Sequence, residues 1–183
     1  MAIMRIVVTG PVGSGKSTFV RTVSEIQTVD TDRQATDETA LLKATTTVAM
    51  DFGRVTFGNK MSLHVYGTPG QERFDFMWEI LIEHAHAYIL LVPGHQPGAF
   101  RTARRILTFM EQRVRLPYLV GVTHLDVPQA WPLPYVGMAV GVHPDLLLAV
   151  NATQKPSVVS ALVQLIQRCH TRRTQSQLSA QEV

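Results

Sequence analysis

Short apolar runs alternate with longer stretches of helical periodicity along the chain. The helix-like stretches cover residues 16–27, 74–84, 98–113 and 157–170, and in the third of them apolar residues recur at spacings of three and four. The strand-like runs cover residues 3–9, 48–57, 60–66, 87–92, 118–123 and 146–151. This alternation predicts a single three-layer α/β domain, in which helices cover both faces of a mostly parallel, six-stranded sheet.

Turn and loop residues refine this prediction. Gly58-Asn59 separates two strand-like runs and indicates a hairpin, so that one edge strand should be antiparallel. Residues 28–46 are rich in Thr and Asp and predict a long functional loop. The four prolines within residues 126–144 leave room only for a short helix near residues 135–140. We expect a domain of residues 1–170, followed by a polar, disordered tail of residues 171–183.

Composition narrows the class of protein. Apolar residues make up 45% of the 183 residues and charged residues only 17%, whereas about 25% is usual for charged residues. The net charge of +3 is too small to indicate a nucleic-acid-binding protein. A single cysteine, Cys169, excludes an internal disulfide and favours the reducing cytoplasm. No apolar run approaches the roughly 18 residues of a membrane span, so we expect a cytoplasmic protein without a transmembrane segment.

Residues 10–17 read Gly-Pro-Val-Gly-Ser-Gly-Lys-Ser and match the phosphate-loop pattern G-x-x-x-x-G-K-[ST] in full. A strand-like run precedes the pattern and a helix-like stretch opens at Lys16, as the pattern requires. Glycines allow successive N–H groups to turn toward a phosphate chain, and the helix N-terminus adds partial positive charge. Lys16 should contact the β- and γ-phosphates, and Ser17 should bind Mg²⁺. The predicted nucleotide contacts here are Gly10, Val12, Gly13, Ser14, Gly15, Lys16, Ser17 and Thr18.

Four later segments occur in a recognisable order. They are residues 47–52 (Thr-Val-Ala-Met-Asp-Phe), 66–74 (Tyr-Gly-Thr-Pro-Gly-Gln-Glu-Arg-Phe), 123–126 (Thr-His-Leu-Asp) and 151–153 (Asn-Ala-Thr). With the phosphate loop they resemble the motifs of Ras-superfamily small GTPases, and most of all the bacterial Ras-like group, which includes a polarity GTPase of gliding motility. The resemblance spans residues 3–170. It implies a molecular switch that binds GTP and GDP and hydrolyses GTP slowly with Mg²⁺.

The resemblance implies roles in metal binding and catalysis. Thr47 would bind Mg²⁺ together with Ser17, and it would share the γ-phosphate with the Gly70 N–H. Gln71 would orient the attacking water, while Lys16 stabilises the phosphates. Arg33, in the long loop, is our candidate for an arginine finger that reaches the γ-phosphate.

The resemblance also implies a base site. Asp126 would accept hydrogen bonds from the guanine ring N–H and exocyclic amine, and the Ala152 N–H would donate to the guanine oxygen. The rest of this site would be formed by Thr123, His124, Asn151 and Thr153.

Partners are expected at two switch segments: the first includes the long loop and Thr47, and the second begins at Pro69. By resemblance these would be an effector and an activating or exchange factor, with regulators of the roadblock type among the candidates, acting on a monomer or a dimer. Five residues place apolar bulk on the second switch: Phe74, Phe76, Trp78, Ile80 and Leu81. One interpretation is a partner surface, so that Trp78→Ala would weaken binding of a regulator, and the other is that these residues anchor a helix on the sheet. Their helical spacing favours a mixture of the two.

Some residues depart from the family pattern. Gly67 replaces an Asp that holds Mg²⁺ and Val12 replaces a Gly beside the γ-phosphate, while Thr123 and His124 replace Asn and Lys at the base. These departures leave two alternatives open. One is a nucleotide-bound scaffold that does not cycle or hydrolyse, and the other is a P-loop ATP binder with relaxed base specificity. A P-loop kinase is disfavoured, because residues 70–74 have no role in its chemistry.

Overall fold

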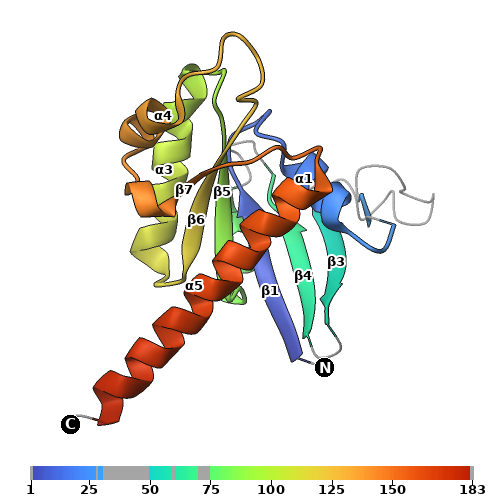
Figure 1. Ribbon diagram of the computed structural model, residues 1–183, viewed down its shortest axis with the longest axis vertical. Coiled ribbons are helices and arrows are strands. Elements are labelled where there is room, and N and C mark those ends of the chain that lie inside the picture. Colours follow the sequence, from blue (N-terminus) through green and yellow to red (C-terminus); the bar gives the residue numbers. More distant parts are fainter. Residues whose placement is uncertain (1, 28, 31–49, 59–60, 70–74, 182–183) are drawn as a thin grey trace.

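The strands form one sheet around the strand that leads into the phosphate loop (Figure 1). The computed structural model describes residues 2–27, 29–30, 50–58, 61–69 and 75–181. The strands are Ala2–Thr9 (β1), Val29–Asp30 (β2), Asp51–Phe57 (β3), Met61–Gly67 (β4), Ala87–Pro93 (β5), Tyr118–Thr123 (β6) and Leu147–Ala149 (β7). Their order across the sheet is β2-β3-β4-β1-β5-β6-β7.

The sheet is mostly parallel. β1 pairs in parallel with β4 and β5, and parallel pairing continues through β6 to β7. β3 is antiparallel to β4, and Gly58 begins their hairpin with a φ of 58°, a conformation that glycine tolerates. These observations confirm the predicted α/β fold of the P-loop type. The two-residue β2 pairs with β3 and gives the described sheet a seventh strand, so β3 is not the edge that the sequence predicted.

Helices cover both faces of this sheet. α1 (Lys16–Val23) and α5 (Lys155–Gln181) pack on one face, where α5 runs diagonally across the strands in Figure 1. The opposite face carries α2 (Asp75–Glu83), α3 (Gly98–Arg113) and α4 (Leu133–Val140), and a short 3₁₀ helix, Pro144–Leu146, precedes β7. The three predicted layers are therefore present.

Alternation of side chains along the central strands builds two cores. In β1, Ile6 and Val8 face α1 and α5, whereas Val7 faces the helices of the other side. β5 is buried along its whole length because it lies inside the sheet and is covered on both faces. Both central strands therefore hold the loops at their carboxyl ends on a rigid base.

Two helix boundaries differ from prediction by four residues or more. α1 ends at Val23 because Ser24 adopts extended backbone, and its hydroxyl donates to the Ile26 carbonyl at 2.8 Å. α5 continues to Gln181, past residue 170, where the sequence predicted that the helix would end and the tail begin. Residues 171–181 include neither Gly nor Pro, and nothing in their sequence therefore ends the helix. None of the described helices is both long and apolar enough to cross a membrane.

Candidate nucleotide-binding site

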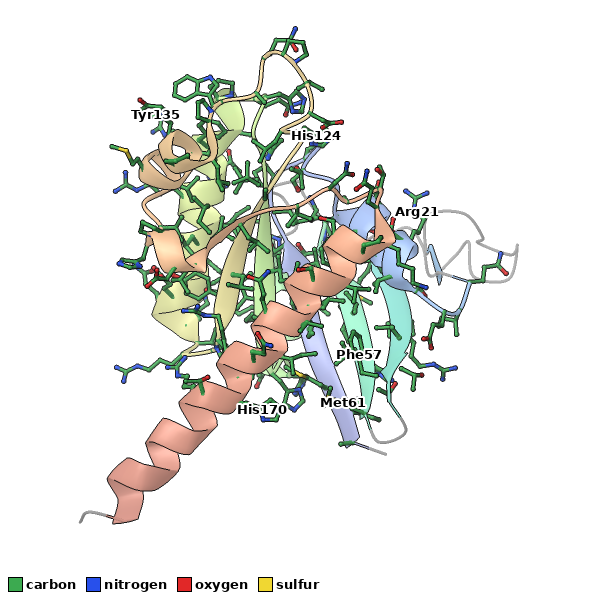
Figure 2. All side chains as sticks on the ribbon, in the orientation of Figure 1. Arg21, Phe57, Met61, His124, Tyr135 and His170 are labelled. Atoms are coloured by element: carbon green, nitrogen blue, oxygen red, sulfur yellow. The ribbon has the colours of Figure 1, made fainter. Side chains whose placement is uncertain are left out.

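The phosphate loop, residues 10–17, lies between β1 and α1 at the carboxyl edge of the sheet. β2, β3 and β4 lie on one side of β1, and β5, β6 and β7 lie on the other. The strand order thus reverses at this point, which is where open α/β sheets bind ligands. Figure 2 shows His124 at this end of the sheet, whereas Met61 and His170 lie at the opposite end. The loops after β1 and β6 therefore meet at one edge.

Three glycines give the loop its shape. Gly10, Gly13 and Gly15 have φ angles of 144°, 78° and 90°, in a region that residues with side chains rarely adopt. A Cβ atom at Gly10 would overlap the Leu91 carbonyl oxygen. The loop is therefore pressed against β5, and its backbone takes the form that the phosphate-loop pattern predicts.

The Lys16 ammonium is folded back onto its own loop. Its Nζ donates to the carbonyl oxygens of Gly10 at 2.8 Å and Pro11 at 2.6 Å, and to Ser14 Oγ at 3.3 Å. The side chain is buried, and burial lowers the pKa of Lys16 to about 8, although the Asp51 carboxylate acts in the opposite direction. A buried cation held only by neutral oxygens is poorly stabilised, and an anion in the loop would improve its environment.

Ser17 is hydrogen-bonded to the carboxylate of Asp51, a residue that the sequence did not predict as part of the site. Ser17 Oγ donates to Asp51 Oδ2 at 2.5 Å. Asp51 begins β3 and lies directly opposite Gly67, the last residue of β4. A Cβ atom built on Gly67 would lie 3.1 Å from both Cβ and Oδ2 of Asp51. The side chain of Asp51 therefore occupies the space that a side chain at position 67 would take.

Thr123 joins the end of β6 to the phosphate loop. Its hydroxyl donates to the Ser14 carbonyl oxygen at 3.0 Å and lies 3.4 Å from the Val92 carbonyl oxygen. His124 Nδ1 lies 2.9 Å from Thr123 Oγ1. The Thr123 hydroxyl has one proton, which it donates to Ser14, so the proton in the hydrogen bond between Thr123 and His124 is carried by His124 Nδ1. Burial and the neighbouring His95 ring lower the pKa of His124, so its ring is neutral near pH 7, with Nε2 as an acceptor.

The loop after β7 also lies against the phosphate loop. Ala152 is buried, and its methyl group would lie 3.4 Å from a Cβ on Gly15. Asn151 Oδ1 accepts hydrogen bonds from the backbone N–H of Thr153 at 3.0 Å and from its hydroxyl at 2.7 Å. These bonds fix a tight turn in which Asn151 orders the loop. The structure thus brings this predicted segment to the site.

A fourth segment, His95-Gln96 after β5, was not predicted from the sequence. The amide of Gln96 would lie 3.5 Å from a Cβ on Gly13. The ring of His95 lies 4.6 Å from the ring of His124, centroid to centroid. Its Nδ1 is buried and has no hydrogen-bond partner within the described part of the chain. Polar residues directly after a buried strand at the carboxyl edge were the available signal.

The remaining predicted residues have different outcomes. Val12 is 61% exposed on the loop, and Thr18 is half-buried in α1. Asp126 lies exposed on the turn after His124. Four predictions, Arg33, Thr47, Gly70 and Gln71, lie outside the described residues. Of the two predicted metal ligands, Ser17 is therefore the one that the structure places in the site.

Comparisons with known proteins give a family and a distant relative. A family model described as "Conserved hypothetical ATP binding protein" matches residues 8–172. The chain is also 32% identical over 81 residues to "Uncharacterized protein MJ1339" of Methanocaldococcus jannaschii. This match covers 44% of the chain and 51% of the relative, so the chain spans about half the length of that protein.

The family match contradicts the resemblance to the Ras superfamily and its bacterial Ras-like group. The phosphate loop and the polar loops at the carboxyl edge of the sheet carried much of that resemblance, and P-loop nucleotide-binding folds share both as a class. Departures from the small-GTPase pattern were already visible in the sequence, at Val12, Gly67, Thr123 and His124. The small-GTPase assignment is therefore wrong.

Proposed function

The chain belongs to the family of conserved hypothetical ATP-binding proteins, and from this premise we propose that it binds ATP, as its Mg²⁺ complex, at residues 10–17. We propose further that its base site discriminates weakly between adenine and guanine. Lys16 and Ser17 bind the phosphates and the metal in this proposal, and the loops after β5, β6 and β7 surround the nucleoside.

The observation that supports this proposal most directly is the environment of Lys16. Its Nζ is held by carbonyl oxygens of the loop, in the position where a phosphate chain would lie. Burial lowers the pKa of Lys16 to about 8 even though the Asp51 carboxylate acts in the opposite direction. Phosphate oxygens would replace neutral acceptors by charged ones, and such hydrogen bonds are about twice as strong. The loop is therefore arranged for a polyanion.

The groups after β6 support weak base discrimination. Thr123 uses its hydroxyl proton on the Ser14 carbonyl oxygen, and His124 uses its Nδ1 proton on Thr123. Neither of these protons is left to read a base. The neutral His124 ring offers a flat surface and one acceptor nitrogen, which suit either purine by stacking.

GTP is the second candidate ligand, and Asp126 is the residue that favours it. An ionised carboxylate accepts two hydrogen bonds, and guanine presents two adjacent donors, its ring N–H and its amine. Asp126 is exposed on the turn after His124, where it can approach a base from solvent. A GTP-driven switch with protein partners is a finer proposal that depends on this preference.

Titration of a fluorescent ATP analogue with Mg²⁺, and its displacement by ATP, GTP and CTP, tests the proposal. We expect saturable ATP binding, and ATP and GTP should compete within about tenfold of each other, a difference of about 1.4 kcal/mol. Lys16→Met should weaken binding about 100-fold, because charge-assisted hydrogen bonds are lost. Absence of saturable binding by any triphosphate would contradict the proposal.

The same titration decides between the two bases. A preference for GTP of about 1,000-fold or more, equivalent to about 4 kcal/mol, that disappears in Asp126→Ala would establish the second candidate. Release of phosphate from the bound triphosphate then separates an enzyme from a scaffold. We propose slow turnover, and a complex that releases no phosphate while its nucleotide stays bound would favour the scaffold.

A further inference from the structure

We propose that Asp51 supplies the carboxylate that holds Mg²⁺ beside Ser17, in place of the residue at position 67. The inference rests on the proposed function, because the metal enters with the triphosphate. It assigns a metal-binding role to a residue on the antiparallel strand β3, whereas P-loop proteins use the Asp of a separate Walker-B segment.

The first observation is the bond between the two metal-binding groups. Ser17, the predicted Mg²⁺ ligand, donates its hydroxyl proton to Asp51 Oδ2 at 2.5 Å. Both oxygens therefore converge on one point at the start of α1. Mg²⁺ takes oxygen ligands and is commonly held by one or two carboxylates, substrate phosphates and water. A serine hydroxyl and one carboxylate are the protein's share of such a site.

The second observation is the cross-strand pair. Asp51 and Gly67 are direct partners in the register of β3 and β4, and directly opposite residues of an antiparallel pair project to the same face. A Cβ on Gly67 would lie 3.1 Å from Cβ and Oδ2 of Asp51 and 3.4 Å from Val20 Cγ2 in α1. Both positions thus point toward α1, and only one of them has room for a side chain.

The backbone of Gly67 gives a third argument. Gly67 ends a regular strand and lacks the positive φ that favours glycine. Its conformation would therefore accept an aspartate, and the requirement for glycine comes from the side chain of Asp51. The Asp51 carboxylate, at the start of β3, thus lies beside Ser17 in the space that a side chain at the end of β4 would take.

The set of oxygen ligands agrees with a cation that arrives together with the phosphates. Within the described ranges no group of three or more His, Cys, Asp or Glu residues gathers as a metal site. A site of Ser17 and Asp51 would therefore bind metal weakly alone and tightly with the phosphates of ATP.

The test removes the carboxylate from position 51 and then introduces one at position 67, on the opposite strand. Asp51→Asn removes the charge and keeps the shape, while the double variant Asp51→Gly/Gly67→Asp moves the carboxylate to position 67. The double variant has room for its new side chain, because both contacts at 3.1 Å are made by Asp51 itself. Unfolding temperature and circular dichroism show whether each variant is folded.

The readout is the affinity of the ATP-bound protein for Mn²⁺, which electron paramagnetic resonance measures directly. We expect Asp51→Asn to weaken Mn²⁺ binding about 10- to 100-fold. ATP binding in EDTA should be no weaker than in wild type, because no metal is present to be lost and a negative charge near the phosphates is removed. The double variant should recover most of the lost Mn²⁺ affinity.

The alternative is that Asp51 only caps Ser17. In that case Asp51→Asn lowers the unfolding temperature and weakens ATP binding in EDTA, but leaves Mn²⁺ affinity unchanged, which would overturn the inference. A folded double variant that recovers no Mn²⁺ affinity would also overturn it. If wild-type protein binds no ATP with or without metal, it is the proposed function that fails instead.

Discussion

The Thr123 hydroxyl donates to the Ser14 carbonyl oxygen at 3.0 Å, across 109 positions of sequence. Both residues are buried, Thr123 to 1% exposure and Ser14 completely. This bond fixes the loop after β6 relative to the phosphate loop, so that the two halves of the proposed nucleotide site cannot shift independently.

Thr123→Val should destabilise the protein by about 1–3 kcal/mol, because the buried Ser14 carbonyl loses its donor. Urea unfolding followed by circular dichroism measures the change. Thr56→Val is the matched control, since Thr56 lies exposed in β3 and should change the free energy of unfolding by less than about 0.5 kcal/mol. Equal stability of the two variants would show that the bond does not hold the loops together.

Lys16→Met should remove a pH dependence from the stability of the protein without nucleotide. Burial lowers the pKa of Lys16 from 10.5 to about 8, so the charged ammonium opposes folding. This cost is fully present below pH 8 and is relieved as pH rises from 8 toward 10.5. The free energy of unfolding of wild type should therefore rise between pH 7 and pH 10, by about 2–3 kcal/mol relative to Lys16→Met, which has no amine to titrate. Urea unfolding at both pH values measures the difference, and an equal pH dependence of the two proteins would contradict this account.

Nucleotide affinity should fall as pH rises above about 8. A bound triphosphate keeps Lys16 charged, whereas Lys16 in the free protein loses its proton near its pKa of about 8. Binding above that pH therefore takes up a proton, and the affinity should fall by up to about tenfold per pH unit. The phosphates are already ionised there, with a second pKa near 6, and do not contribute. Titration at several pH values between 7 and 10 measures the slope, and Lys16→Met should show none.

The sequence left two interpretations of Trp78 open, a partner surface and a helix anchor. Its side chain is 2% exposed, its ring packs against Phe109, and its Nε1 donates to the Pro69 carbonyl oxygen at 3.2 Å. Trp78 therefore acts as a helix anchor, as one of the two interpretations had it, whereas its effect on the binding of a regulator stays a prediction. Ile80, two residues later, is 54% exposed.

Trp78→Ala should cost about 3–5 kcal/mol of stability, because a large buried ring is lost. Trp131→Ala is the control, since Trp131 is 44% exposed and meets Phe100 only edge to face, and it should cost about 1 kcal/mol. Thermal unfolding compares the two. A small effect at Trp78, similar to that at Trp131, would show that α2 is held by other contacts.

The fold was predictable because it rests on local patterns. Apolar runs of strand length marked β1, β5 and β6 almost to the residue, and α3 was predicted with its observed bounds, Gly98–Arg113. The phosphate loop was predictable for the same reason, since its glycines, lysine and serine are contiguous. Each of these features is specified by residues that are neighbours in sequence.

The rest of the site depends on register, which the sequence does not display. Asp51 acts beside Ser17 only because β3 pairs with β4 so that Asp51 faces Gly67, and a shift by one residue would turn it away. In the sequence, Thr123 could be interpreted only as a replacement for an Asn at the base site. Its hydrogen bond to Ser14 depends on the distance between two loops, which the sequence does not display. The segments of the site could therefore be predicted from the sequence, whereas the contacts between them could not.

Gly10→Ala should be far more disruptive than Gly58→Ala, although both glycines have positive φ. Gly10 has a φ of 144° and its Cβ would overlap the Leu91 carbonyl oxygen, whereas Gly58 has a φ of 58° and a Cβ there would have no atom within 4 Å among the described residues. Gly58→Ala should cost about 1 kcal/mol, the strain of a left-handed residue.

Gly10→Ala adds a collision with the backbone of β5 to that strain, and we expect a loss of at least about 3 kcal/mol. Urea unfolding of both variants, compared with wild type, measures the difference. Because the loop can escape the collision only by moving away from β5, Gly10→Ala should also weaken binding of the ATP analogue. Similar losses of stability at the two positions would show that the phosphate loop is not held against β5 at Leu91.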